Sequence, residues 1–146
     1  MNEPSGQSKQ PPVEVAAGLV FRLGKLLITQ RFSDAHLGGL WEFPGGKREP
    51  NESFRDCLRR ELREELGIEV TVGQLVEQIS HSYPEKTVHL NFYRCDWLQH
   101  EPQALGCPAW RWITHEELGK YEFPAADAQL VEKLQADVSL WAGSAN

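Results

Sequence analysis

Apolar residues between Val13 and Gln30 form two dense runs with a short break between them. Val13–Phe21 is largely apolar, which is typical of a strand with both faces buried. Gly24 interrupts the pattern before Lys25–Gln30, and glycine supplies the backbone freedom that a tight turn needs. The pattern therefore predicts a β-hairpin over this stretch.

The strongest helical pattern lies between Asn51 and Gly67. Asn51 directly follows Pro50 and is a favourable N-cap residue, and Gly67 is a favourable residue at the C-terminal cap. The apolar side chains between them recur every four residues and form one stripe: Phe54, Leu58, Leu62 and Leu66. We expect an amphipathic helix from near Asn51 to Gly67.

Strand patterns dominate the middle of the chain, and helical patterns return at its end. The expected short strands are Ile68–Val72, Leu75–Ser80, Thr87–Phe92 and Trp110–Ile113. A helical turn is expected to begin at Glu116–Leu118, and an amphipathic helix over Ala126–Trp141, with Leu130, Leu134, Val138 and Trp141 on one side. Such an order predicts an α/β fold in which helices pack on a mixed sheet.

Composition and charge limit the class of protein. A chain of 146 residues with 40% apolar content suits one domain, which we expect over residues 13–142 after a disordered, proline-containing leader, Met1–Pro12. The net charge of −6 comes without a basic patch, which argues against a long nucleic-acid partner but leaves a small anionic ligand open. No apolar run approaches the ~18 residues of a membrane span.

Three scattered cysteines indicate free thiols, and we expect a cytoplasmic monomer or homodimer.

Three glutamates on the predicted helix, Glu61, Glu64 and Glu65, share an arc about 100° wide, because residues three and four apart are neighbours. This arc overlaps the inward-facing side of the helix. Repulsion between Glu61 and Glu65 costs roughly 0.2–0.5 kcal/mol, and partial burial costs more. A hard divalent cation, Mg²⁺ or Mn²⁺, would offset these costs. On the helix alone, a solvated surface with ion pairs such as Arg60 with Glu64 is an equal alternative.

The residues before the helix decide between these alternatives. Phe43-Pro44-Gly45-Gly46-Lys47 begins a longer motif: from Gly46 the chain reads Gly, five residues, Glu52, seven residues, then Arg60-Glu61-Leu62-Arg63-Glu64-Glu65-Leu66-Gly67-Ile68. This arrangement matches the Nudix box at every defined position. Over roughly residues 13 to 140, the chain resembles the MutT-like nucleoside triphosphate pyrophosphatases of the Nudix family.

The resemblance implies an α/β/α sandwich with a mixed sheet and a metal-dependent hydrolase. It implies that Glu61, Glu64 and Glu65 bind the metal with the Gly46 carbonyl, and that Arg60 and Glu52 support them. The implied reaction is attack of metal-activated water on phosphorus, which releases a nucleoside monophosphate and pyrophosphate. Glu61 becomes the first candidate for the base, with Arg60 and Glu64 beside it in the catalytic set.

The resemblance also indicates where a substrate would bind. It implies that Arg31 contacts phosphates, that Phe43 packs on a nucleobase, that Lys47 lies in the substrate site and that Asp127 reads the base edge. From residue type alone, a surface arginine and a core phenylalanine are the alternatives. Asp127 stands where the best-known oxidised-guanine enzyme has asparagine, and an ionised aspartate only accepts hydrogen bonds. Bases that present donors are therefore favoured.

Three functions remain open at this point. A housecleaning hydrolase for an 8-oxo-dGTP-like nucleotide is the first hypothesis, and a pyrophosphatase for (d)CTP or its 5-substituted forms is the second. A non-catalytic domain that recognises oxidised guanine, like the C-terminal part of MutY, is the alternative of another class. A loop glutamate that helps to bind metal in the oxidised-guanine enzyme aligns near Gly106, and Glu42 or Glu101 are candidate substitutes.

Overall fold

The computed structural model describes residues 11–142, so nearly all of the predicted leader, Met1–Pro12, lies outside the described residues. The strands are β1 (Val13–Arg22), β2 (Lys25–Gln30), β3 (Trp41–Glu42), β4 (Gly45–Lys47), β5 (Glu69–Ser82), β6 (Thr87–Gln99) and β7 (Trp110–Ile113). The helices are α2 (Phe54–Leu66), α3 (Ala128–Ala136) and α4 (Ser139–Ala142), with 3₁₀ helices η1 (His115–Lys120) and η2 (Ala125–Asp127).

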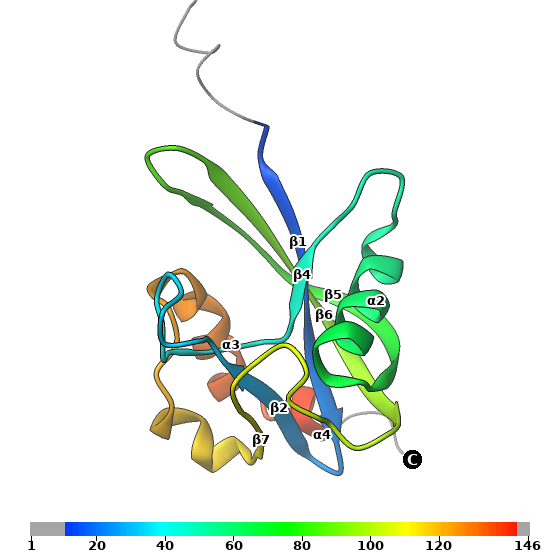
Figure 1. Ribbon diagram of the computed structural model, residues 1–146. Helices are drawn as coiled ribbons and strands as arrows, with labels where there is room; N and C mark the ends of the chain where they lie inside the picture. The colour runs from blue at the N-terminus through cyan, green and yellow to red at the C-terminus, as the bar shows by residue number, and fades with distance from the viewer. Residues whose placement is uncertain (1–10, 143–146) are drawn as a thin grey trace, which may run out of the picture.

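The described strands form one mixed sheet with the order β3-β2-β1-β6-β5, to which β4 and β7 add by pairing with β1 and β2 (Figure 1). Strand β1 is parallel to β6, whereas the other pairs are antiparallel. The predicted hairpin is confirmed, with Phe21 opposite Leu26 and a turn at Leu23 and Gly24. Consecutive residues of β1 are buried from Ala16 to Phe21, so the sheet is covered on both faces there.

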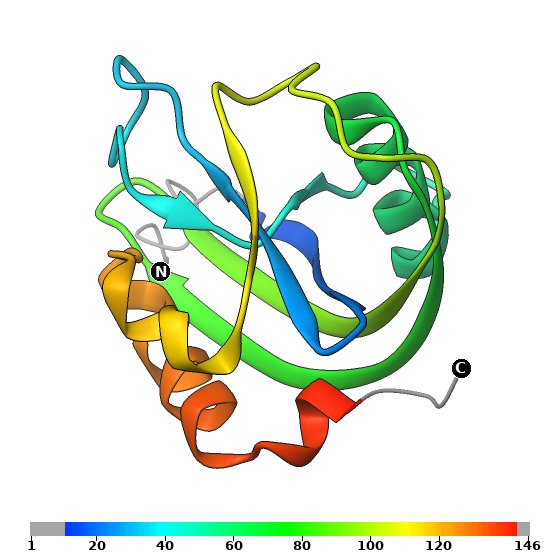
Figure 2. The ribbon, with the colours of Figure 1, turned by 90° about the horizontal axis from the view of Figure 1, so that it is seen from below.

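Side-chain alternation along β1 supplies two cores, one on each face of the sheet. Ala16 and Val20 pack with the apolar stripe of α2, while Ala17, Leu19 and Phe21 pack with α3, α4 and η1. Viewed from below, α2 lies on one side of the sheet and the C-terminal helices lie on the other (Figure 2). The predicted α/β/α sandwich is therefore confirmed.

Helix α2 begins two residues later than the Asn51 cap predicts. Asn51 has φ 66° and belongs to the preceding turn, a conformation that asparagine tolerates. Ser53 is the N-cap instead, because its hydroxyl accepts the Asp56 N–H over 3.0 Å. The C-terminal cap is confirmed at Gly67, whose φ is 70° and whose N–H donates to the Arg63 carbonyl.

Two other predicted elements differ from the structure. The two short strands expected between Ile68 and Ser80 are one strand, β5, with irregular pairing between Val72 and Leu75. The prediction of one closing helix over Ala126–Trp141 is wrong, because the helix is interrupted at Asp137. The Asp137 carboxylate accepts the Ser139 N–H and so competes with the helical backbone. Val138, placed on the apolar side by periodicity, is 59% exposed. None of the helices within residues 11–142 is long and apolar enough to span a membrane.

Candidate active site

Strand β4 holds Gly46 against helix α2. Pairing of β4 with β1 sets Gly46 opposite Ala16, and the Glu61 carboxylate lies directly on the Gly46 Cα, where a Cβ atom would overlap it. The buried Cys57 thiol, also on α2, donates to the Gly46 carbonyl over 3.6 Å. Close approach of the helix therefore requires glycine at this position.

Arg60 connects the acidic side chains of the box. Its Nε and Nη2 donate to the two carboxylate oxygens of Glu52 over 2.7 and 3.0 Å. Its Nη1 donates to Glu61 over 3.1 Å and to Glu64 over 3.2 Å. The bond to Arg60 holds the pKa of Glu52 at about 2. The bidentate pair with Glu52 thus orients the guanidinium toward the other two carboxylates.

The three helix glutamates share one face but differ in their surroundings. The Glu64 side chain is 61% exposed and that of Glu61 is 22% exposed. Glu65 is half-buried, and its Oε1 has no hydrogen-bond partner. As they lie, no three His, Cys, Asp or Glu side chains of the described chain are grouped closely enough to hold a metal ion. The Arg60–Glu64 ion pair of the alternative interpretation is also present.

Burial leaves several carboxylates here without full compensation for their charge. It raises the pKa of Glu65 to about 8, and the neighbouring charges of Glu42 and Glu61 add to the effect. Burial likewise raises the pKa of Glu61 despite Arg60, and that of Glu42 despite Arg31. Ionised carboxylates in such surroundings need a positive partner.

These residues suit a hard divalent cation. The carboxylate oxygens of Glu61, Glu64 and Glu65 and the Gly46 carbonyl would be the donors, since Mg²⁺ and Mn²⁺ prefer oxygen ligands. The unpartnered, buried Oε1 of Glu65 has the character of a ligand atom. When bound, such an ion neutralises phosphate charge and lowers the pKa of a water molecule.

We expect the stability of the metal-free protein to fall as pH rises from about 4.5 to about 8. Over this range Glu65 keeps its proton in the folded chain and loses it in the unfolded chain, so the folded state binds more protons and loses stability as pH rises. The change attributable to Glu65 should be roughly 2–4 kcal/mol. Urea unfolding with a chelator measures it, and Mg²⁺ should restore stability at the upper end. An identical pH slope for Glu65→Gln would contradict this assignment.

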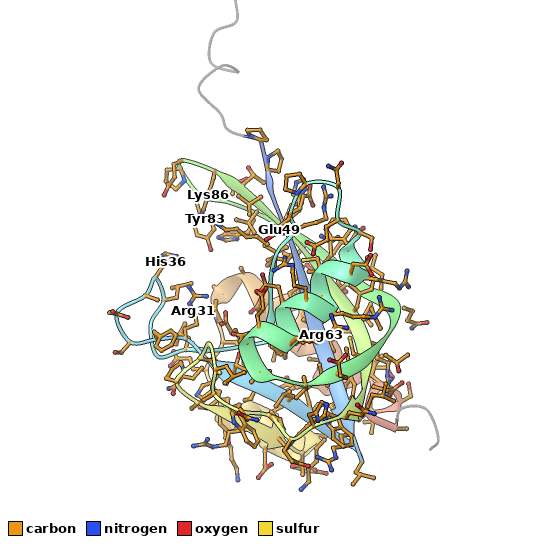
Figure 3. All side chains as sticks on the ribbon, turned by 45° about the vertical axis from the view of Figure 1, so that its right-hand side comes forward. Arg31, His36, Glu49, Arg63, Tyr83 and Lys86 are labelled. Atoms are coloured by element: carbon orange, nitrogen blue, oxygen red, sulfur yellow. The ribbon has the colours of Figure 1, made fainter. Side chains whose placement is uncertain are left out.

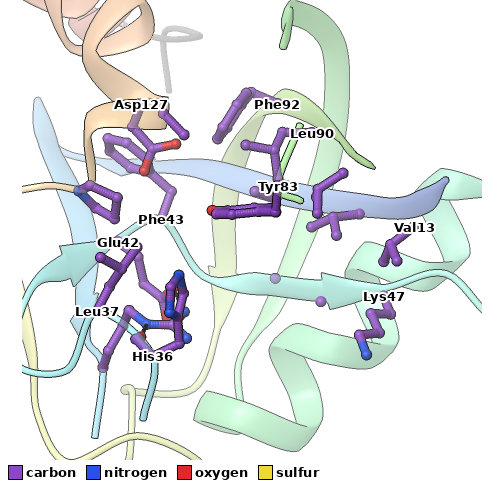
Figure 4. A pocket seen from close by; sticks show the side chains of 18 of the residues that line it. Val13, His36, Leu37, Glu42, Phe43, Lys47, Tyr83, Leu90, Phe92 and Asp127 are labelled. Carbon is purple, nitrogen blue, oxygen red and sulfur yellow. Dashed lines mark hydrogen bonds and ion pairs between the residues drawn. The ribbon is translucent and has the colours of Figure 1, made fainter. Parts of the chain in front are cut away.

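A cleft of about 540 Å³ opens beside the contact between Gly46 and Glu61. Strands β1, β4 and β6, the loop after β2, the β5–β6 hairpin tip and η2 contribute to its walls. All four residues predicted to bind substrate line it: Arg31, Phe43, Lys47 and Asp127. In Figure 4, Asp127 lies near Phe43 and Phe92, whereas Lys47 lies toward the other end. Sequence positions almost 100 residues apart therefore meet in one cavity.

Glu42 links the cleft to the carboxylates of helix α2. Arg31 donates through Nη1 to Glu42 over 2.8 Å and through Nε to the His36 carbonyl over 2.6 Å. Asp127 is 7% exposed, and burial raises its pKa to about 6, with the charge of Glu42 adding and that of Arg31 opposing. Because Glu42 also raises the pKa of Glu65, its charge acts on both ends of the site.

The family model of the Nudix domain matches residues 16–133, which is most of the chain. The chain belongs to the Nudix family. The CTP pyrophosphohydrolase of Escherichia coli K12 is 41% identical over 124 residues, covering 85% of this chain and 92% of that protein. The 8-oxo-dGTP diphosphatase of the same organism is 30% identical over 124 residues, covering 84% and 96%.

Solved structures agree with this membership. The solution structure of the E. coli ORF135 protein has a TM-score of 0.77 at 41% identity, covering 92% of this chain and 94% of that one. The MutT protein of methicillin-resistant Staphylococcus aureus 252 has a TM-score of 0.71 at 33% identity, covering 87% and 98%. The MutT-like Nudix resemblance is confirmed, and the protein is a hydrolase that acts on acid anhydrides.

The two candidate substitutes for the Nudix loop glutamate lie in different places. Glu42 lines the cleft. Glu101 instead forms an ion pair with Arg22 over 2.7 Å and does not line this cleft. The loop at Gly106 contacts α2 through its backbone, with the N–H groups of Leu105 and Gly106 donating to the Glu65 carbonyl. Glu42 is therefore the substitute that the geometry favours.

Three residues that line the Nudix cleft were not among the predicted site residues: His36, Tyr83 and Lys86. Tyr83 and Lys86 lie at the β5–β6 hairpin tip, and His36 lies on the loop opposite (Figure 3). The sequence feature that could have indicated Tyr83 and Lys86 is the proline-containing turn between two predicted strands, because such a turn places both residues at one hairpin tip. Phe43 is buried and stacked on Phe123, which agrees with the alternative of a core aromatic.

Proposed function

We propose that this Nudix hydrolase cleaves a nucleoside triphosphate to the monophosphate and pyrophosphate, with Mg²⁺ or Mn²⁺ held by Glu61, Glu64, Glu65 and the Gly46 carbonyl. The observation that carries the proposal is the single cleft that joins Gly46 to Asp127. A nucleotide with its base at Asp127 extends its phosphates toward Gly46 and the carboxylates. The free cysteines among residues 11–142 are compatible with a cytoplasmic location, as a monomer or homodimer.

The side chains divide the work of the reaction. Arg31 and Lys47 line the cleft and neutralise phosphate charge. Arg60 holds Glu61 and Glu64 in place through its hydrogen bonds. Glu61 is half-buried and contacts Gly46 at the edge of the cleft, beside the proposed metal site, where its carboxylate can accept a proton from an attacking water. Glu61 is therefore our proposed general base.

A cytosine nucleotide is the substrate we favour, with an oxidised guanine nucleotide second. The similarity to the CTP pyrophosphohydrolase, 41% identity over 92% of that protein, supports the first. The similarity to 8-oxo-dGTP diphosphatases supports the second. Buried Asp127 suits both, because the cytosine amino group and the guanine N–H groups are donors to a carboxylate.

A nucleotide panel tests the proposal. CTP, dCTP, 5-methyl-dCTP, 8-oxo-dGTP and ADP-ribose are incubated with the protein and Mg²⁺, and monophosphate and pyrophosphate are quantified separately. We expect the cytosine nucleotides to give the highest kcat/KM and equal amounts of the two products. Cleavage of ADP-ribose alone would overturn the triphosphate assignment.

The preference between the two bases is expected to depend on pH through Asp127. The neutral acid offers one donor and one acceptor and matches the N3 and amino group of cytosine, while the ionised form offers two acceptors and matches two guanine donors. With a pKa of about 6, lowering the pH from 8 to 5.5 should raise the CTP to 8-oxo-dGTP ratio of kcat/KM by about fivefold. Asp127→Asn should make this ratio independent of pH; a ratio that still varies in the variant would contradict the role.

A further inference from the structure

Tyr83 projects into the cleft from the tip of the β5–β6 hairpin. The tip is a tight turn, in which the Tyr83 N–H donates to the Lys86 carbonyl over 2.7 Å and the Lys86 N–H returns a bond over 3.3 Å. Figure 4 shows the Tyr83 side chain in the middle of the cleft, between Asp127 with its phenylalanines and the end that holds Lys47. The position is fixed by the hairpin backbone.

The other aromatic rings near Asp127 are already enclosed. Phe43 and Phe92 are 5% and 2% exposed. Phe43 stacks on Phe123 at 5.0 Å with an interplanar angle of 8°, and meets Phe92 edge-on at 6.0 Å. Tyr83, in contrast, is half-buried. Of the described aromatic rings that line this cleft, it therefore keeps more open surface than either phenylalanine.

Two histidines pack nearly perpendicular to the Tyr83 ring. His81, on β5, lies 4.6 Å from the ring centre at 68°, and His36, on the loop after β2, lies 5.6 Å away at 81°. Two near-perpendicular contacts of this kind restrict the plane of the ring, which lines the cleft and stays only half-buried. The contact with His36 also joins two segments of chain on opposite sides of the cleft, as Figure 3 shows.

We propose that Tyr83 is a substrate-binding residue whose ring packs against the nucleobase held at Asp127. This inference rests on the proposed function and adds to it a base-contacting surface from the hairpin tip. Phe43, which the sequence predicts to pack on the base, instead forms the floor of the cleft. An aromatic side chain accepts any base, so Tyr83 contributes affinity while Asp127 selects the base edge.

Kinetics of Tyr83→Leu and Tyr83→Phe test the inference. For Tyr83→Leu we expect KM for the preferred triphosphate to rise about 10- to 100-fold with kcat within about threefold, because base stacking is lost equally in ground state and transition state. Tyr83→Phe keeps the ring and should stay within about threefold of wild type. If Tyr83→Phe were as impaired as Tyr83→Leu, ring packing would be overturned.

Product inhibition separates contact with the base from contact with phosphate. In Tyr83→Leu the inhibition constants of CMP and 8-oxo-dGMP should rise, whereas that of inorganic pyrophosphate, which has no base, should not change. Tyr121→Leu is the matched control, since Tyr121 packs edge-on against Trp41 at 5.1 Å outside the cleft. If the inhibition constant of pyrophosphate rose as much as those of CMP and 8-oxo-dGMP, or if Tyr83→Leu kept a wild-type KM, the role of Tyr83 would be overturned. Neither result would contradict the proposed function. A wild-type protein that hydrolyses no nucleotide overturns the proposed function.

Discussion

Glu64→Gln is expected to lower kcat by at least about 10³-fold while the protein keeps its fold. The proposed role of Glu64 is to bind a metal that supplies several kcal/mol of transition-state stabilisation, and an amide lacks the negative charge. The side chain is 61% exposed, so the exchange buries no unpaired group. Arg60 keeps its bonds to Glu52 and Glu61, which preserves the rest of the cluster.

Steady-state hydrolysis of CTP over a Mg²⁺ titration measures the fall in kcat, and thermal unfolding measures whether the fold is kept. Glu132→Gln is the matched control, because Glu132 is an exposed glutamate on α3. It should have wild-type turnover. If Glu64→Gln retained full turnover, the metal assignment of the helix would be wrong.

Gly46→Ala is expected to lower kcat by about 100-fold. The added methyl group would occupy the space of the Glu61 carboxylate, which must then move away from the Gly46 carbonyl. Displacement of a reacting group by about 1 Å costs a rate factor on this order. Overpacking should also cost stability, by roughly 1–3 kcal/mol.

Gly119→Ala is the control for Gly46→Ala, because a Cβ atom at Gly119 would lie in ordinary contact, 3.9 Å from Gln135 Nε2. Its kcat should equal that of wild type. Comparing kcat at saturating Mg²⁺ with thermal unfolding separates displacement of Glu61 from general loss of fold. A wild-type kcat for Gly46→Ala would show that the Glu61 carboxylate need not lie at Gly46.

Predictions from local pattern were accurate where neighbouring residues decide the conformation. The hairpin around Gly24 and the end of α2 at Gly67 depend on backbone freedom at single residues. The pattern was wrong where two local signals compete. Ser53 caps the helix in place of Asn51, and Asp137 breaks the C-terminal helix, because short polar side chains bond to nearby backbone in ways that periodicity does not contain.

By itself the sequence determined the family and the common face of Glu61, Glu64 and Glu65, because helical spacing is a local property that a motif records directly. Only the tertiary structure decided what surrounds that face. Parallel pairing of β1 with β6 and antiparallel pairing of β1 with β4 bring Tyr83 and Gly46 to one cleft, and packing of the C-terminal helices on the sheet adds Asp127. Such contacts follow from strand order and burial over long separations, and no spacing along the chain encodes them.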